Sequence, residues 1–583
     1  MSDATETERN NLLWKWQTSS PGTFALAVVV CLFLLTFLVI TPVYDVNDDP
    51  AMALVASGYG TVDGPDEHLI YTNVLIGQVL KQLYQMNSDL PWYGGYLLTI
   101  HFISYWLLLY VLLLLDRTLF SLIYFVLFYL VAGIYFLTHL QFTSTAFLLG
   151  MSGLFLILTN LILDKRRESH SMLKWGGGLC LIISSLIRFP AVQLLLLASA
   201  PFLVVMAFRL FRQVKINSYL APAFLTVVAV LGSAAYDHQY YQQDKDWQHY
   251  KNYSGAVAEL VNYAQVPYTD QTKPLFDEIG WSNYDFWMLK SWFYLDPETY
   301  NLERIQKFKT RRTEFTLWKF PEVMNFRIVS AKSAFMNLTF LFCFIGAVIV
   351  VRQQNNNTWQ RRTINGMLFW TVLLMLSFLI YLKLPERIYI PLVSFPFFVS
   401  IYFVACEITE HNEQGQSKRR LFRRWGIPVL FLLACCLFWN QKQWSEKIVG
   451  INYQFKQDLI QLQEEMPDKV FLAWAPFPID CFLPLDTQVE SRDLKYLWLT
   501  GRQSTPIFHR RQNEYQIKSP YQDLYETDRL LLISNPVSNR VLKGYLKQHY
   551  GVNVAFQEIY KGGNFRVYKV IHRQADPAQS ALN

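Results

Sequence analysis

The sequence has little charge for its length. Only 17% of its 583 residues are Asp, Glu, Lys or Arg, whereas 16% are Phe, Trp or Tyr. A soluble protein needs more charge than this on its surface. Runs such as 25–40 and 107–115 carry no charge, and a helix needs roughly 20 mostly apolar residues to cross a bilayer core. The scarcity of charge therefore excludes an ordinary soluble protein and predicts a membrane protein.

Several signatures of function are also missing. The seven cysteines show neither zinc-ligand spacing nor a disulfide framework, and there is no glycine-rich nucleotide loop or serine elbow. The net charge of +7 does not indicate a nucleic-acid partner, because Lys and Arg cluster in short segments between apolar runs. These absences leave the polar segments between the spans as the place for chemistry.

The apolar runs predict an α-helical polytopic membrane protein with about eleven spans. We expect them at 22–43, 94–115, 118–138, 143–163, 174–187, 190–208, 218–236, 328–351, 365–383, 388–406 and 426–439. The stretch 174–209 is predicted to be a hairpin turning at Arg188, since a single span would put basic clusters on both sides of the membrane. The clusters that then share the cytoplasmic side contain Lys165, Arg166, Arg167, Arg209, Arg212, Lys215, Arg361, Arg362 and the basic residues of 418–424.

This topology leaves three large polar segments on the outer side, at 44–93, 237–327 and after about residue 440. We expect a transmembrane domain over 1–439 and a small extracytoplasmic α/β domain over 440–583. In the α/β domain the sequence predicts strands near 470–474 and 529–534, a helix at 539–550, and a hairpin that turns at Gly562 and Gly563. In the first polar segment, 69–83 has the spacing of an amphipathic helix on the membrane surface.

The sharpest local feature is Asn47-Asp48-Asp49-Pro50, just beyond the first span. Two adjacent carboxylates accept a proton, bind a divalent cation, or raise each other's pKa. The structural alternative is that Asp49 caps a helix with Pro50 at its first position. A cap does not use Asp48, so Asp48 is the better candidate for a general base.

Two further groups of polar residues are candidates for substrate binding. His68 follows a turn-like acidic stretch, 63–67, for which a solvated turn is the default interpretation; the functional alternative is that His68 orients an acid or binds a metal. The second outer segment interleaves carboxylates with Trp, which suits sugar rings, and an interfacial aromatic belt with capping acids is the alternative. Its candidates are Asp277, Glu278, Trp281 and Asp285.

Three cations are predicted at the outer ends of spans. Arg188, Lys383 and Arg387 lie where the sequence otherwise places few basic residues. Cations at that height can hold a lipid-linked phosphate by charge-assisted hydrogen bonds. Each one alone is also explained by snorkelling toward lipid headgroups. Together they indicate a phosphate site.

This arrangement resembles the GT-C fold of integral membrane glycosyltransferases, particularly the protein O-mannosyltransferase and aminoarabinose transferase group. In that fold a first span is followed by a large outer loop with an acidic motif, then by many spans, a second outer loop and often a soluble tail. The match covers nearly the whole chain in layout. At the level of a motif it rests on Asp48 and Asp49, which stand where the group often has an Asp-Glu pair.

The resemblance implies transfer of a sugar from a polyprenyl-phosphate donor to a glycan, lipid or protein acceptor outside a bacterial cytoplasmic (inner) membrane, with the N-terminus inside. Asp48 would be the base, Asp49 would orient it or hold a divalent cation, and the lipid phosphate would leave against the three cations. No other cofactor is implied. A polytopic transporter, or a flippase or polymerase of lipid-linked glycans, is the alternative, although most spans lack the central charges and the half-repeat of transporters.

Overall fold

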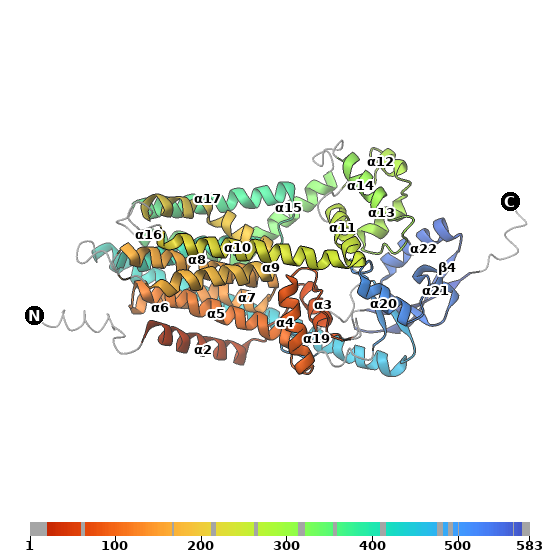
Figure 1. Cartoon of the computed structure of the whole chain (residues 1–583), viewed down its shortest axis with the longest axis horizontal. Helices are drawn as coiled ribbons and strands as arrows, with labels where there is room; N and C mark the ends of the chain where they lie inside the picture. The colour runs from red at the N-terminus through yellow and green to blue at the C-terminus, as the bar shows by residue number, and fades with distance from the viewer. Residues whose placement is uncertain are drawn as a thin grey trace, which may run out of the picture.

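The computed structural model describes residues 20–59, 64–165, 168, 170–210, 217–261, 266–312, 321–353, 358–408, 416–474, 482–487, 494–499, 501–563 and 565–573. Long helices form an elongated bundle, and shorter helices with a small sheet lie at one end of it (Figure 1). The bundle elements are α2 (Pro21–Val39), α5 (Trp92–Leu115), α6 (Leu119–Phe128), the π-helix η1 (Tyr129–Gly133), α7 (Ile134–Thr138), α8 (Phe142–Lys165), α9 (Ser171–Leu210), α10 (Asn217–Gln243), α15 (Pro321–Met336), α16 (Leu338–Gln353), α17 (Thr358–Tyr381), α18 (Glu386–Ile408) and the first part of α19 (Gln416–Glu465).

The bundle has the length and apolarity of a membrane domain. Among the described residues, eight helices are long and apolar enough to cross a bilayer, or nine if the pair 323–336 and 338–350 is one span. That pair is bent by 58°, because the Asn337 side chain accepts from the Phe340 N–H and starts a new helix there. The count differs from the predicted eleven since α9 is one element here and the predicted span 426–439 lies within α19.

Helix α9 nevertheless turns back on itself at Arg188, as predicted from charge. Arg188 has extended backbone angles, φ −160° and ψ 99°, inside α9. A side chain added at Gly150 of α8 would lie 2.9 Å from both Ser184 and Leu195. These two residues would be about 16 Å apart along a straight helix, at 1.5 Å per residue. The two halves of α9 therefore both pack on α8, and Arg188 lies at their turn.

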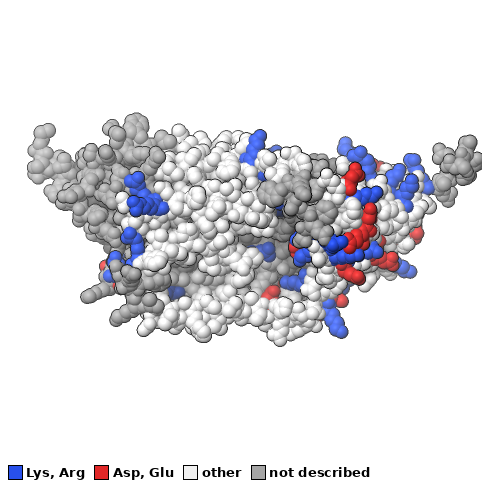
Figure 2. Space-filling model, turned by 90° about the horizontal axis from the view of Figure 1, so that it is seen from above, with Lys and Arg blue, Asp and Glu red and all other residues white. Residues whose placement is uncertain are grey.

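Charge is concentrated at the two ends of the molecule. Figure 2 shows a long surface with few charged residues between a basic end and an end where acidic and basic residues mix. Helix α8 runs along the bundle from Phe142 to Lys165. The guanidinium of Arg209 lies 3.9 Å from the centroid of the Trp359 ring. Of the predicted cytoplasmic cluster, Arg166, Arg167, Arg212, Lys215 and the side chains of 418–424 lie outside the described residues.

The polar end of the molecule, which we call the head, is built from two separate parts of the chain. Its sheet has the order β2-β1-β3-β5-β4, with β1, β2 and β3 parallel and β4 and β5 an antiparallel hairpin. The predicted strands, the helix and the hairpin are confirmed. Its elements are α11 (Lys245–Glu259), α12 (Lys273–Glu278), α13 (Asn283–Lys290), α14 (Leu302–Arg311), β1 (Val470–Ala473), β2 (Tyr496–Trp498), α20 (Pro506–Glu514), α21 (Pro520–Glu526), β3 (Leu530–Ser534), α22 (Pro536–Tyr550), β4 (Val554–Lys561) and β5 (Arg566–His572).

The two parts of the head share one hydrophobic core. Phe293 of the second polar segment stacks on Tyr521 at 5.1 Å, and the Trp474 indole N–H donates to the Ser291 carbonyl at 2.8 Å. Buried side chains from 253–308 and from 470–570 belong to the same cluster. The second polar segment is thus packed on the C-terminal region. The expected domains, 1–439 and 440–583, assign these two packed segments to different domains.

The first polar segment lies between the bundle and the head. It holds α3 (Asp48–Ser57) and α4 (Val74–Met86), the latter starting five residues later than the amphipathic spacing predicts because Asn73 caps it by accepting from the Leu75 N–H. Buried Leu54 of α3 packs in a cluster with residues of β1, β2 and β3. The start of the segment is fixed by a bridge between Tyr44 and Leu140.

Candidate functional site

Helix α3 begins before the position that the sequence indicates. Asp48 and Asp49 lie in its first turn, Asn47 is the residue before it, and no side chain caps it. The expectation that Asp49 caps the helix is therefore wrong. The cause is tertiary: the Asp49 carboxylate is turned toward the bundle, where other donors reach it.

Asp49 is completely buried at the junction of three elements. Its Oδ1 accepts from the Tyr93 hydroxyl at 2.9 Å and from the Phe142 N–H at 3.2 Å. Its Oδ2 is buried and has no hydrogen bond among the described residues. Burial raises the pKa of Asp49 well above its usual value, against the lowering effect of the Tyr93 hydrogen bond. A buried carboxyl held by two donors, with its pKa raised, suits positioning of α3.

Asp48 has the opposite environment. It is half buried, and its carboxylate has neither a hydrogen bond nor an ion pair within the described ranges. Its charge acts on the phenol of Tyr71, whose pKa is raised first by burial and then by Asp48. Asp48 is thus the carboxylate of the pair that a ligand can reach.

Arg188 contacts Tyr71 directly. Its Nη1 donates to the Tyr71 carbonyl at 3.1 Å, and its guanidinium lies 5.5 Å from the Tyr71 ring centroid and 5.3 Å from that of Phe142. The charges of Arg502, Arg188 and Arg387 all lower the pKa of the Tyr71 phenol. The charges of one carboxylate and three guanidinium groups, from four parts of the chain, therefore all act on the Tyr71 phenol, and Arg188 contacts Tyr71 directly.

The cations continue along the bundle end. Burial and the charge of Arg387 lower the pKa of Lys383, and burial and the charge of Lys383 lower that of Lys290 in the head. Like charges are thus held close together at this boundary, as is typical of a site that binds an anion. The predicted cations Arg188, Lys383 and Arg387 all lie at the end of the bundle that faces the head.

Two carboxylates accompany Arg387. Burial raises the pKa of Asp45 to about 6, with the charge of Glu386 adding to the rise and that of Arg387 opposing it. The Tyr135 hydroxyl donates a hydrogen bond to Glu386. Arg387 is therefore flanked by two acids whose charge partly balances its own.

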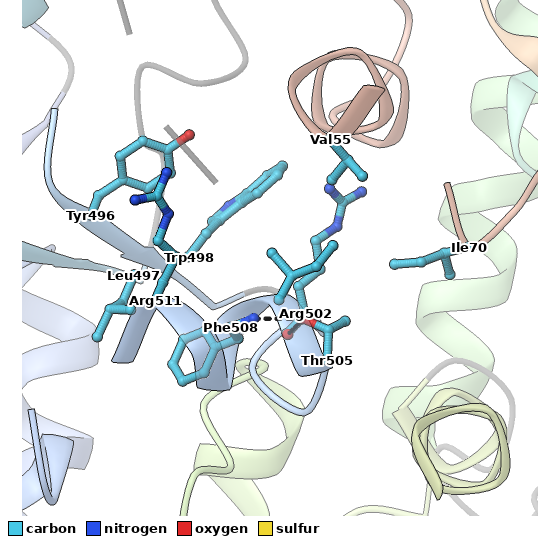
Figure 3. A pocket seen from close by; sticks show the side chains of 10 residues that line it. Val55, Ile70, Tyr496, Leu497, Trp498, Arg502, Thr505, Phe508 and Arg511 are labelled. Carbon is cyan, nitrogen blue, oxygen red and sulfur yellow. Dashed lines mark hydrogen bonds between the residues drawn. The ribbon is translucent and has the colours of Figure 1, made fainter. Parts of the chain in front are cut away.

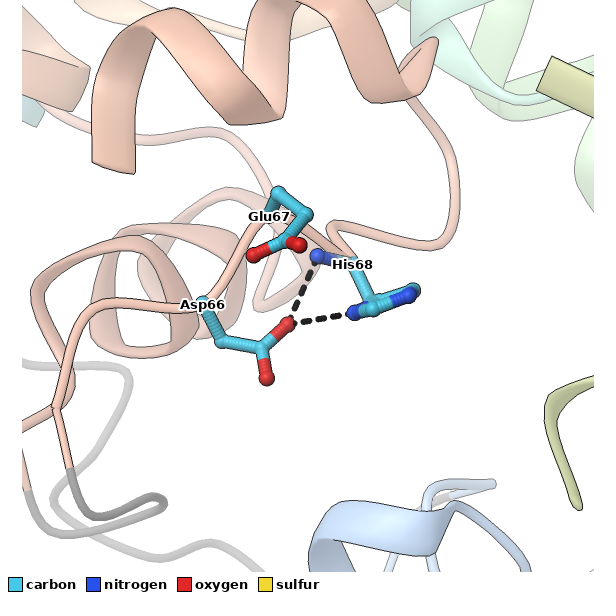
Figure 4. A group of neighbouring side chains, drawn as sticks. All are labelled: Asp66, Glu67 and His68. Atoms are coloured by element: carbon cyan, nitrogen blue, oxygen red, sulfur yellow. Dashed lines mark hydrogen bonds and ion pairs between the residues drawn. The ribbon is translucent and has the colours of Figure 1, made fainter. Parts of the chain in front are cut away.

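The Asp66-Glu67-His68 stretch forms a cluster in which Asp66 and His68 are hydrogen-bonded (Figure 4). Asp66 Oδ1 lies 2.7 Å from His68 Nδ1 and also accepts from the His68 backbone N–H, and the His68 ring stacks on Trp247 at 4.4 Å. Burial alone would raise the pKa of Asp66, but the His68 hydrogen bond and the charges of His68 and Arg510 lower it.

The three ligand-type side chains of this stretch lie within 4.8 Å of one another, which is compatible with a metal ion. However, Glu67 is already engaged, with Lys81 at 2.6 Å and with the Tyr240 hydroxyl at 2.6 Å. Asp66 faces Arg510 at 3.3 Å. The stretch is thus neutralised by protein cations, and it joins the first polar segment to the head.

Two of the four candidates in the second polar segment, Trp281 and Asp285, are buried in the head. Trp281 is 2% exposed and its indole N–H donates to the Thr299 carbonyl at 2.8 Å, so no sugar ring can stack on it. Asp285 is fully buried, completes a capping box with Ser282 and lies 2.7 Å from His549.

The remaining two candidates are on the surface. Glu278 pairs with Lys307 and Arg311, and Asp277 is exposed. Trp281 and Asp285 therefore serve core packing and helix capping, whereas Asp277 and Glu278 stay predicted substrate-binding residues.

Sequence reasoning missed Tyr71, Lys290 and Arg502. Tyr71 is one of 34 tyrosines, and Lys290 and Arg502 lie in segments whose packing beside the bundle no local pattern indicates. The available signal for Arg502 was Gly501, three residues after the end of a short apolar strand, which is typical of a tight turn at a sheet edge.

The layout is that of an α-helical polytopic membrane protein, with one candidate span, a large polar segment, many further candidate spans and a polar C-terminal region. Among solved structures, the chain is similar to that of ArnT from Cupriavidus metallidurans bound to undecaprenyl phosphate. The similarity covers 94% of this chain and 97% of that chain, with 10% sequence identity and a TM-score of 0.47. No protein-family model and no curated protein sequence matches the chain.

Proposed function

We propose that the chain is a membrane glycosyltransferase that moves a sugar from a polyprenyl-phosphate donor to an acceptor on the extracytoplasmic side. The observation that carries the proposal is one reachable carboxylate beside several cations, where the bundle meets the head. Asp48 acts on the same Tyr71 phenol as Arg188 and Arg387. Sugar transfer from a lipid phosphate requires both a base and a phosphate-binding group at one place.

In the proposed step, the Asp48 carboxylate takes the proton of an acceptor hydroxyl as its oxygen forms a bond to the anomeric carbon. The bond from that carbon to the phosphate oxygen breaks, and the electron pair leaves with the polyprenyl phosphate. One displacement inverts the anomeric centre. Arg188, Lys383 and Arg387 stabilise the charge that develops on the leaving phosphate, and the proton on Asp48 passes to water.

Asp49 would support this step without contacting the substrate. Its hydrogen bonds to Tyr93 and to the Phe142 N–H tie the first turn of α3 to α5 and α8. Asp48 is its chain neighbour, so the same bonds fix the position of Asp48 at the end of the bundle. A neutral Asp49 also adds no second negative charge beside a phosphate.

The side of the membrane is inferred from the basic end of the bundle. Lys165, Arg209 and Arg361 belong to the end away from the head, where Lys174 also lies over Tyr219 at 5.1 Å. Lys and Arg are enriched in cytoplasmic segments. We therefore place the head and the proposed site outside, which suits acceptors of the bacterial cell envelope.

The test uses the detergent-purified full chain and a panel of undecaprenyl-phosphate-linked hexoses, pentoses and aminopentoses. Release of undecaprenyl phosphate is followed with envelope glycolipid or protein as acceptor. Asp48→Asn should lower the rate about 100-fold or more, since a positioned base typically contributes 10²- to 10⁴-fold. Asp89→Asn is the matched control, because Asp89 is an exposed acid of the same polar segment.

The proposal fails if Asp48→Asn transfers sugar at the wild-type rate. It fails equally if no sugar of the panel is transferred while the protein moves a lipid-linked glycan across proteoliposomes, since that would identify a flippase.

A further inference from the structure

Arg502 lies at an edge of the sheet where ligands commonly bind. It follows β2, which pairs in parallel with β1, and β1 also pairs in parallel with β3 on its other side. The carboxyl ends of these three strands form one edge, and the chain order changes direction at β1. In open sheets with parallel strands, ligands bind outside the carboxyl ends at such a change of direction.

The loop that carries Arg502 is held by several contacts. The Arg502 N–H donates to the Leu499 carbonyl at 3.2 Å, and its carbonyl accepts from the Thr505 N–H at 2.9 Å and hydroxyl at 2.7 Å. Gly501 has φ +90°, and a side chain there would meet the Trp292 ring at 2.9 Å. The backbone is therefore fixed before any ligand arrives.

The side chain of Arg502 is buried, and no carboxylate among the described residues forms an ion pair with it. It is 9% exposed, its guanidinium lies 4.3 Å from the Trp498 ring centroid, and its Nη1 is buried without a hydrogen bond among the described residues. An enclosed guanidinium with an unused donor is costly unless an anion pairs with it. An anion is thus the group that this position lacks.

The guanidinium reaches toward α3. Figure 3 shows it extending from the Arg502 loop toward Val55, beside the Trp498 ring. Arg502, Val55 and Trp498 line a cavity of about 40 Å³, and Ile70 and Phe508 are among the other residues of its wall. The cavity is therefore bounded by the first polar segment on one side and by the head on the other.

The wall opposite Arg502 is strained. Ile70 has φ +73°, a conformation that is a true outlier for a β-branched residue and that often marks ligand sites. The next residue is Tyr71, on whose phenol Arg502 acts together with Asp48, Arg188 and Arg387. The cavity thus adjoins the proposed site rather than forming a separate one.

We propose that Arg502 binds a phosphate group at this boundary, so that the C-terminal region supplies a substrate-binding residue to a site otherwise built by the bundle. The inference rests on the proposed function for its substrate class. The phosphate belongs either to the lipid carrier or to a water-soluble acceptor or product. The cavity's aromatic walls and the Arg502 guanidinium, whose Nη1 has no hydrogen bond among the described residues, suit a phosphate attached to an apolar or ring-shaped group.

The experiment measures binding rather than transfer, and uses the purified full chain. Undecaprenyl phosphate in detergent and inorganic pyrophosphate in buffer are the two probes. Arg502→Met keeps the stem on Trp498 and removes the charge, and Arg502→Lys restores the charge. Arg540→Gln is the control, since Arg540 is an exposed arginine of α22 in the same region. The melting temperature is recorded for each variant.

We expect Arg502→Met to weaken binding of one probe about ten-fold or more, which is the range of a charge-assisted hydrogen bond, and Arg502→Lys to restore most of it. A loss confined to undecaprenyl phosphate assigns the lipid carrier, and a loss confined to pyrophosphate assigns a water-soluble phosphate. Unchanged binding in Arg502→Met overturns the inference, and so does a loss that Arg502→Lys does not restore. The binding assay involves no sugar transfer. Its result is therefore independent of the Asp48→Asn transfer test, and either test can fail without the other.

Discussion

The Tyr93 hydroxyl donates a 2.9 Å hydrogen bond to Asp49. This bond gives Asp49 an environment different from that of Asp48, its chemically identical neighbour. Asp49 is enclosed, whereas Asp48 is half buried and lacks a hydrogen-bond partner within the described ranges. A side chain's role here is set by the helix that faces it and not by its place in a motif.

Asp49→Asn should leave transfer within a few-fold of wild type and make stability less dependent on pH. The pKa of Asp49 is raised by burial, so the folded state keeps a proton that an unfolded Asp releases above about pH 4. The wild type is therefore stabilised by Asp49 at low pH and loses that contribution as pH rises through the folded-state pKa. Melting temperatures at pH 4 to 8 test this; an equal slope in both proteins would contradict it.

Asp45→Asn should tighten binding of the donor at neutral pH. The pKa of Asp45 is about 6, so Asp45 is ionised above that pH and partly neutralises Arg387. The effect should be about two- to five-fold in the donor KM, as for a partly solvated ion pair. A sugar phosphodiester donor keeps its charge between pH 5 and 8, so wild-type KM should rise with pH and the variant's should not.

Asp89→Asn is the control for the Asp45 series as well. A parallel rise of KM in wild type and Asp45→Asn would assign the pH dependence to another group.

His549→Gln should loosen the packing of α13 on α22, most clearly at acidic pH. The hydrogen bond to buried Asp285 raises the pKa of His549, although burial opposes it. Its stabilising effect is fully present below about pH 6.5 and is lost as pH rises through the folded-state pKa. We expect a loss of about 1.5 kcal/mol at pH 6, seen as faster hydrogen exchange in both helices.

The exposed His572, changed to Gln, provides the comparison for this pair. If His549→Gln and His572→Gln exchange alike at pH 6, the pair does not hold the two helices together.

Gly501→Ala should impair phosphate binding beyond its cost in stability. Both Gly501 and Gly551 have positive φ, at +90° and +68°, but only at Gly501 would a side chain meet another residue. A positive φ costs roughly 1–2 kcal/mol for alanine at either position. Gly551→Ala should therefore lower the melting temperature alone, whereas Gly501→Ala should also displace Arg502 and weaken binding of whichever probe depends on it.

Local patterns predicted much of the fold. The spans follow from apolar runs, the turn at Arg188 from the distribution of Lys and Arg, and the strands at 470–473 and 530–534 from short apolar segments. These features are decided by residues near one another in the sequence. The bend at Asn337 was missed because a single capping side chain interrupts an otherwise continuous apolar run.

The site was predictable only in part. Asp48, Arg188 and Arg387 were predicted as candidate site residues because their height relative to the spans is visible in the sequence. Trp281 was misassigned, because an indole in the core and an indole on a sugar ring look alike without tertiary contacts. Arg502 lies more than 300 residues from Arg188 in the chain, and only the packing of the head on the first polar segment brings their charges to one phenol.

Helix α19 continues without interruption from the bundle into the head. Ser445 donates to the Thr41 carbonyl beside the bundle, and Phe455 and Leu462 pack beneath the sheet. One extra residue between these contacts would raise the head by about 1.5 Å and turn it by about 100° around the helix axis. The register of this helix therefore sets the angle at which Arg502 faces the bundle, so the spacing between 445 and 455 should tolerate substitution far better than insertion or deletion.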